Sequence, residues 1–168
     1  MPTKRTSPKS PDAPGEQAEG VVLPALLRAA RGSYGHAIRM SLARAGFDDV
    51  PRNGAFVLGG IVNQSGSAGD LVRQLGVSKQ AASQLIETLV VRGYLERRPH
   101  GEDRRRVTIE ATDRGREAAK AVRAGVIAVD KELEGLISAR DLAGLRAGLV
   151  ALCDIRERME DEARAGLG

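Results

Sequence analysis

From residue 21 onward, apolar residues recur every three or four positions over most of the chain, the spacing of amphipathic helices. One stretch departs from it, because residues 106–111 alternate apolar and polar side chains as a strand of a half-buried hairpin does, and residues 94–98 are expected to form the other strand. We expect residues 99–105 to form the loop of this hairpin. The pattern therefore predicts helices at residues 21–45, 52–63, 79–92 and 112–137 and a last helix beginning at Ser138 or Asp141.

A further short helix precedes residue 79. Ser67 is a candidate N-cap with Asp70 three residues on, and Gly76 ends this helix before Ser78 caps the next. So short a connection holds two helices at a steep angle, the helix-turn-helix arrangement. Gly93 ends the second helix and leads into the hairpin, so the sequence predicts a mainly α fold: a winged helix-turn-helix whose wing is the hairpin, flanked by helices.

The helix of residues 79–92 has a polar outer face. Its apolar residues, including Ala82 and Leu89, fall on one side and are expected to point inward. The polar residues left on the other side are Lys79, Gln80, Ser83, Gln84 and Thr88. Three consecutive arginines, Arg104 to Arg106, make the hairpin the most basic point of the chain.

Charge is unevenly distributed along the 168 residues, whose net charge is +4. Residues 51–111 carry nine basic and six acidic side chains, whereas residues 112–168 carry ten and eleven. The positive surplus therefore lies on the predicted winged helix, which suits an anionic partner without identifying it. Residues 1–20 carry balanced charge and four prolines with almost nothing apolar, so we expect a disordered tail.

Several classes of function are poorly supported. The single cysteine, Cys153, excludes an intramolecular disulfide and a cysteine-built metal site, and we expect its thiol to be buried. With no motif for a nucleophile, a metal or a nucleotide phosphate, we expect neither an enzyme nor a cofactor. No apolar run reaches the roughly 18 residues of a membrane helix, so a cytoplasmic protein is expected.

The hairpin carries a recognisable motif. Asp103-x-Arg105, then Ala111-Thr112 and Gly115, resembles the wing of the MarR family of bacterial transcriptional regulators, and the order of helices over residues 21–165 matches as well. The family usually has Leu where this chain has Ala111. The resemblance implies a homodimer, with residues 21–50 and 112–168 forming the dimerisation helices, residues 51–111 the DNA-binding region and residues 1–20 a tail.

The resemblance also implies a mode of DNA binding. Gln80, Ser83 and Gln84 would meet base edges in the major groove, while Lys79, Thr88 and the backbone at Ser78 would meet phosphates. Arg105, held by Asp103, would enter the minor groove. Further phosphate contacts are expected from Arg97, Arg98, Arg104 and Arg106.

The regulatory input is less marked in the sequence. Members of the family often respond to small aromatic or anionic effectors. His36 and Arg39, one turn apart, are candidates for anion contact, although a solvated or ion-paired face is the commoner reason for such a pair. The alternative function is a winged helix that binds only proteins, since one fold can serve both purposes. The polar outer face of residues 79–92 favours DNA over a protein partner, because a surface that docks on proteins would expose apolar side chains. The expected function is therefore that of a repressor that binds double-stranded DNA.

Overall fold

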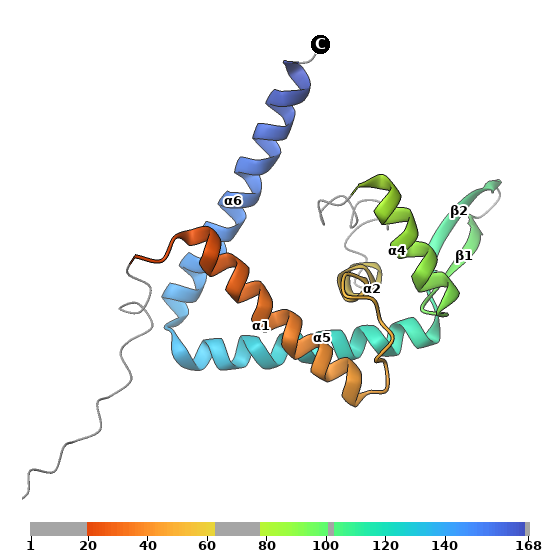
Figure 1. The fold of residues 1–168 in the computed structure, drawn as a ribbon, viewed down its shortest axis with the longest axis horizontal. Coiled ribbons are helices and arrows are strands. Elements are labelled where there is room, and N and C mark those ends of the chain that lie inside the picture. The colour runs from red at the N-terminus through yellow and green to blue at the C-terminus, as the bar shows by residue number, and fades with distance from the viewer. Residues whose placement is uncertain (1–19, 63–77, 101–102, 167–168) are drawn as a thin grey trace, which may run out of the picture. The chain divides into compact units, whose positions relative to one another are not determined.

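The computed structural model describes the backbone of residues 20–62, 78–100 and 103–166, and the side chains of these residues outside 99–107. The described chain is mainly helical with one two-stranded antiparallel sheet, as expected (Figure 1). It divides into two compact units, Val22–Val129 and a second that begins at Asp130. The helix expected after Ser67 and most of the expected tail lie outside the described residues.

The first unit opens with two helices. α1 (Leu23–Arg44) has a proline in its first turn, where the missing N–H costs nothing, and α2 (Gly54–Val62) follows a short connector. Both helices lie within the predicted ranges, with ends one or two residues inside them. The glycine pair of α2 does not interrupt it.

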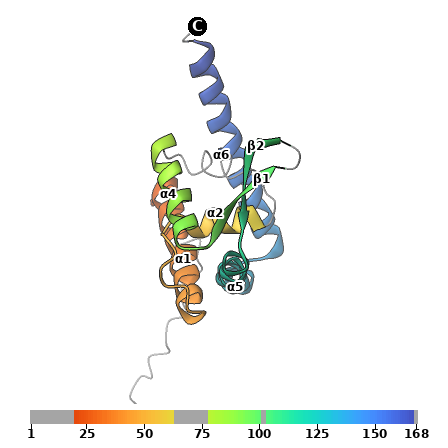
Figure 2. The same cartoon turned by 90° about the vertical axis from the view of Figure 1, so that its right-hand side faces the viewer.

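The second helix of the expected helix-turn-helix and the hairpin follow in the chain. α4 (Lys79–Val91) ends at Gly93, whose φ of +72° turns the backbone into β1 (Leu95–His100). β1 pairs antiparallel with β2 (Asp103–Ala111); the two strands run side by side, and β2 leads into the start of α5 (Figure 2).

The predicted hairpin loop of residues 99–105 is wrong. β1 continues to His100 and β2 begins at Asp103, so most of that segment belongs to the strands. Pro99 pairs with Val107 while His100 pairs with Asp103, and the register is irregular between them. The intervening residues of β2, Arg104 to Arg106, therefore have no paired position on β1, which is the geometry of a bulge.

The core of the first unit is aliphatic. Val57 and Leu58 of α2, Leu89 of α4, and Tyr94 with Leu95 at the start of the hairpin are its largest fully buried side chains. Burying each such side chain contributes about 1.5–3 kcal/mol. The packing fixes α4 and the base of the hairpin against α2, so both elements are held by one core.

α5 (Asp113–Leu136) completes the first unit with its N-terminal part. Thr112 is its N-cap, as predicted, because the Thr112 hydroxyl accepts the Gly115 N–H at 3.0 Å. At Gly125, an added Cβ would lie 2.7 Å from Ile38 Cα, so the backbones of α1 and α5 approach too closely there for any side chain.

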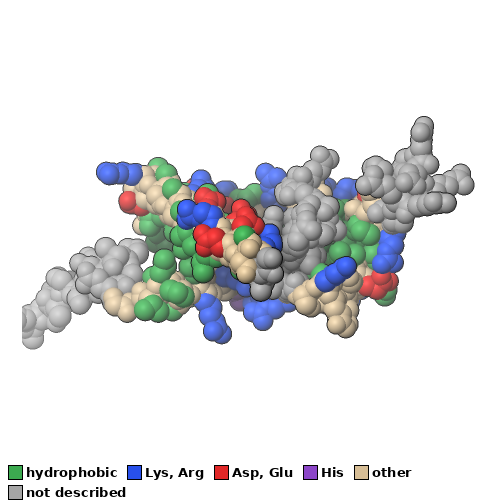
Figure 3. Space-filling model, turned by 90° about the horizontal axis from the view of Figure 1, so that it is seen from above, with side chains coloured by type: hydrophobic (Ala, Val, Ile, Leu, Met, Phe, Trp, Pro, Cys, Tyr) green, Lys and Arg blue, Asp and Glu red, His purple; other side chains and the backbone are tan. Residues whose placement is uncertain are grey.

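The second unit contains α6 (Ala139–Ala165). Ser138 is its N-cap, since the Ser138 hydroxyl accepts the Asp141 N–H at 3.2 Å. No residue of α6 is buried, so its apolar stripe stays on the surface. Seen from above, the described surface carries hydrophobic side chains among charged ones of both signs (Figure 3). The exposed members of this stripe are Leu145, Leu149, Leu152, Ile155 and Met159. Among the helices of the described ranges, none combines the length and apolarity that crossing a bilayer requires.

Candidate nucleic-acid interface

The N-terminus of α4 is capped as the sequence predicts. Ser78 has extended backbone angles, and its hydroxyl accepts the Ala81 N–H at 3.2 Å. One of the helix's otherwise unpaired donors is thereby satisfied, and the positive end of the helix dipole remains at the surface. Ser78 is itself exposed, so this end of α4 is accessible to an anion.

The outer face of α4 presents polar groups to solvent. Lys79, Gln80, Ser83 and Gln84 are exposed, while Ala82 on the opposite face is buried. The Ser83 hydroxyl donates to the Lys79 carbonyl at 3.0 Å, and its lone pairs remain open to a base amino group.

Thr88 differs from the residues before it, because its side chain is half-buried. Its hydroxyl donates to the Gln84 carbonyl at 2.7 Å. A phosphate accepts hydrogen bonds and does not donate them, so the predicted phosphate contact by Thr88 requires this hydroxyl to turn away from the helix.

An acidic residue that the sequence analysis missed lies on the same face. Glu87 of α4 accepts a hydrogen bond from the Arg97 guanidinium of β1 at 2.5 Å, and both side chains are about half exposed, at 51% each. Glu87 follows Ser83 by four residues, a spacing that alone puts the two on one face. The pairing with Arg97 joins α4 to the wing.

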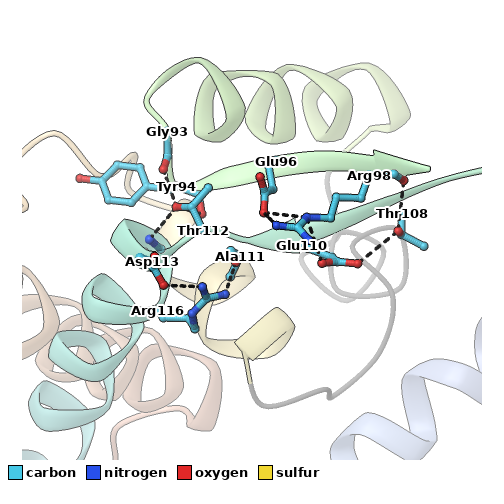
Figure 4. Close-up of polar contacts among 11 residues, drawn as sticks. Gly93, Tyr94, Glu96, Arg98, Thr108, Glu110, Ala111, Thr112, Asp113 and Arg116 are labelled. Carbon is cyan, nitrogen blue, oxygen red and sulfur yellow. Dashed lines mark hydrogen bonds and ion pairs between the residues drawn. The ribbon is translucent and has the colours of Figure 1, made fainter. Parts of the chain in front are cut away.

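Arg98 points to the other face of the hairpin, because neighbouring residues of a strand alternate in direction. It contacts Glu96 at 2.8 Å and Glu110 at 3.6 Å, and these two glutamates lie directly opposite each other across the strands (Figure 4). Its hydrogen bond to Glu96 raises the pKa of the guanidinium further above its usual value. Arg98 thus offsets the repulsion between Glu96 and Glu110. A contact between Arg98 and a DNA phosphate would have to compete with both of these carboxylates.

The wing arginines are placed through their backbone only. Asp103 and Arg104 to Arg106 all belong to β2, and the three arginines occupy its unpaired stretch. Their side chains lie outside the described residues, so the pairing of Asp103 with Arg105 stays a prediction.

A polar cluster joins the base of the wing to α5 and to the connector before α2. The Tyr94 hydroxyl donates to the Asp49 carboxylate, and Arg114 donates to the Asp49 carboxylate at 3.0 Å and to the Tyr94 hydroxyl at 3.1 Å. The Arg114 guanidinium also lies over the Tyr94 ring, 4.6 Å from its centroid. The hydrogen bond from Tyr94, with help from Arg114, lowers the pKa of Asp49, while burial and Asp49 raise the pKa of Tyr94.

A second set of contacts at this junction comes from the N-cap of α5. The Thr112 hydroxyl donates toward the carbonyls of Gly93, at 2.6 Å, and Tyr94, at 3.2 Å (Figure 4). The start of α5 is therefore bonded to the turn that leads from α4 into the wing.

The residues considered for regulation are exposed. His36 and Arg39 both lie at the surface of α1. Cys153 of α6 is also exposed, so the expectation of a buried thiol is wrong for the single chain. The described residues contain no group of three or more acidic, histidine or cysteine side chains fit to hold a metal ion.

Comparison with known proteins agrees with this geometry. The chain resembles wild-type MarR from E. coli (TM-score 0.57, 22% identity, covering 79% of this chain and 97% of that one). It also resembles CouR from Rhodococcus jostii RHA1 bound to p-coumaroyl-CoA (0.65, 22%, 81% and 94%) and an S. aureus MepR–DNA complex (0.65, 16%, 79% and 95%). At these identities the structures show the fold, which is that of a winged helix-turn-helix protein.

A family model matches part of the chain. Residues 49–106, which include α2, α4 and β1, match the model described as the MarR family, whereas comparison with curated proteins returns no match. This segment is therefore similar to the MarR family, and the likeness lies in the predicted winged helix-turn-helix.

Proposed function

We propose that the protein is a homodimeric repressor that binds a pseudo-palindromic operator and leaves it when a small ligand binds. The observation that carries this proposal is the polar outer face of α4, capped by Ser78 and joined at Glu87 to a wing that bears three consecutive arginines. In the proposed organisation, residues 51–111 bind DNA, residues 21–50 and 112–168 form the dimer, and residues 1–20 are a tail.

The proposed contact of α4 is with the major groove. The groove of B-DNA is about 12 Å wide and admits one helix, whose outward side chains meet base edges. Gln80 and Gln84 can each pair with adenine N6 and N7 in a bidentate way, and Ser83 can accept from a base amino group. Lys79, Thr88 and the capped backbone at Ser78 are proposed to meet phosphates.

The proposed contact of the wing is with the minor groove. Arg105 would enter it, held extended by Asp103, because a narrow groove concentrates negative potential. The unpaired stretch of β2 supports this role, since a bulge redirects the side chains of its strand. Arg97, Arg104 and Arg106 are proposed phosphate contacts, and Arg98 a weaker one because of its two carboxylate partners.

The proposed dimer rests on exposed apolar surface. α6 has no buried residue, and six large apolar side chains from Leu145 to Met159 are each 38% or more exposed. Leu23 and Leu26 at the start of α1 are exposed as well. A contiguous apolar stripe of this length is costly in water and is typical of a protein–protein interface, so a second copy would cover it.

The proposal that a ligand releases the protein from DNA is based on the ligands of similar proteins. CouR is described as bound to p-coumaroyl-CoA and S. aureus MepR as bound to ethidium bromide, an acyl thioester and an aromatic cation. For this chain we propose a small aromatic or anionic effector, with His36 and Arg39 as anion contacts. Its DNA partner places the proposed regulator in the cytoplasm, on the nucleoid.

Binding measurements with single variants test the DNA contacts. Arg105→Ala should weaken operator binding without unfolding the protein, and Lys79→Ala should reduce the salt slope by about one unit. Gln84→Ala should instead relax sequence preference, by roughly 1–3 kcal/mol at the contacted base.

Lys120→Ala is the matched control, because Lys120 is an exposed lysine of α5 already paired with Glu117. Electrophoretic shift assays that give unchanged affinity for Arg105→Ala at physiological salt would refute the role of the wing. Binding that is insensitive to salt would favour the alternative function, a winged helix that docks on proteins.

The effector site is tested separately, by screening compounds that release the wild-type protein from DNA. His36→Ala and Arg39→Ala should weaken the response to an anionic compound while leaving operator affinity unchanged. If both variants respond as the wild type does, the proposed site is wrong.

A further inference from the structure

The contact between Glu87 and Arg97 is the structural observation that the proposed DNA contacts leave unexplained. Glu87 is the one acidic residue of α4, and it lies on the polar outer face, one turn beyond Ser83. It also lines, with Gln84 and Arg92, a shallow concavity of about 500 Å³ on that face. A carboxylate in this position would face the phosphates of a DNA duplex, and the repulsion would weaken binding.

The ion pair has little value for folding. Both side chains are half exposed, and exposed ion pairs contribute little to the free energy of unfolding because water and salt screen them. The pair does, however, fix a guanidinium. Arg97 uses one nitrogen, Nη2, to contact Glu87, so the remaining N–H groups of its five stay available for a further acceptor.

The two neighbouring arginines of β1 have different surroundings. Arg97 turns toward α4 and has one carboxylate partner, which lies on the helix proposed to enter the groove. Arg98 turns to the opposite face and lies between two carboxylates of the hairpin itself. Only Arg97 is therefore held at the junction of α4 and the wing, next to the proposed base contacts.

We propose that Glu87 is a positioning residue for DNA binding, which holds the Arg97 guanidinium at this junction so that its free N–H groups donate to a phosphate beside the major groove. A guanidinium fixed in advance loses less conformational entropy when it binds than a free one, and its planar fork suits phosphate oxygens. The inference rests on the proposed insertion of α4 into the major groove.

The direction in which one substitution changes DNA affinity separates this role from simple electrostatic repulsion. Glu87→Ala removes a negative charge, so long-range electrostatics alone predicts tighter binding to DNA. Loss of the positioning contact predicts weaker binding, by about fivefold. In an Arg97→Ala background nothing remains to be positioned, and removing Glu87 should then leave affinity unchanged or raise it.

The experiment measures anisotropy of a labelled operator duplex with the full chain, over a series of KCl concentrations. Wild type, Glu87→Ala, Glu87→Gln, Arg97→Ala and the double variant are compared. Arg97→Ala should weaken binding at least as much as Glu87→Ala and lower the salt slope by about 0.9, the value of one phosphate contact. Glu87→Gln, which keeps an acceptor oxygen, should lose less affinity than Glu87→Ala.

Glu117→Ala is the control, since Glu117 of α5 is another exposed glutamate in an ion pair, with Lys120, and the charge change is identical. It should bind DNA as tightly as wild type or tighter. If Glu87→Ala or Glu87→Gln binds more tightly than wild type, the positioning role is overturned although the proposed function stands. A wild-type chain that shows no salt-dependent binding to any duplex would instead overturn the proposed function itself.

Discussion

Gly115→Ala tests the junction between the wing and α5. An added Cβ at this position would lie 2.0 Å from the Tyr94 carbonyl oxygen and 3.0 Å from its carbon. Cβ atoms essentially never come within 3.0 Å of such atoms, so either the carbonyl or the first turn of α5 must move by about 1 Å. Because both are backbone, no side-chain rotation relieves the clash.

The expected loss follows from the hydrogen bonds that meet at this point. The Tyr94 carbonyl accepts the Thr112 N–H at 3.1 Å, and the Thr112 hydroxyl caps the Gly115 N–H at 3.0 Å. Each of these two bonds contributes about 1 kcal/mol, the second one as the N-cap of α5. Alanine offsets up to about 1 kcal/mol of this loss through its helix preference. The free energy of unfolding should therefore fall by about 1–2 kcal/mol, and Tm by roughly 2–8 °C.

The assay is urea and thermal unfolding followed by far-ultraviolet circular dichroism. Gly135→Ala is the matched control, because Gly135 lies in the same helix and an added Cβ there meets nothing within 4 Å. The control should be as stable as wild type or slightly more stable. If the Gly115→Ala protein is as stable as wild type, or if the control loses as much stability, the clash with the Tyr94 carbonyl is not what makes glycine necessary at this position.

Three further predictions follow from the same structure. Gly125→Ala should destabilise the chain by about 1–3 kcal/mol in thermal unfolding, because the new Cβ meets α1 backbone at 2.7 Å; an increase in Tm would contradict this. The pKa of Asp49 is lowered on folding, so its contribution is complete above its unfolded pKa of about 3.9 and lost as pH falls through the folded pKa. Asp49→Asn should thus be less stable than wild type at neutral pH and approach it below about pH 4, and a difference that persists in acid would count against the cluster. Arg98→Ala should lower stability slightly, since two opposed glutamates lose their shared cation, and should weaken DNA binding less than Arg97→Ala does; a larger loss of affinity in gel-shift titrations would reverse the assignment.

Local features of the fold were predictable from the sequence. Helix positions follow from apolar spacing, and Ser78, Thr112 and Ser138 act as caps because a cap contacts an N–H only three residues away. The polar face of α4 follows from the same periodicity. These are short-range relations, which the order of residues determines almost alone.

Contacts between residues that are far apart in the sequence were not predictable in this way. Asp49, Tyr94 and Arg114 are 20 to 65 residues apart, and their cluster exists only once the core has brought three elements together. The hairpin was misjudged because proline and charged residues interrupt its alternation, whereas the observed pairing depends on backbone hydrogen bonds across the strands. The position of Glu87 on the outer face of α4 follows from the sequence. Its ion pair with Arg97 of β1 does not, because the two residues are brought together only by the packing of α4 against the hairpin.

We propose that the capped helix α4 and the basic wing bind a specific duplex as a dimer. The most direct measurement is selection of genomic fragments by the full chain, followed by hydroxyl-radical footprinting of the enriched site. We expect a pseudo-palindrome with half-sites about 10 bp apart, protected by the wild-type protein in a salt-dependent manner. The Gln84→Ala variant should prefer this site less strongly over other sequences. Fragments that share no site, or a footprint that Gln84→Ala and Arg105→Ala leave unchanged, would contradict the proposal.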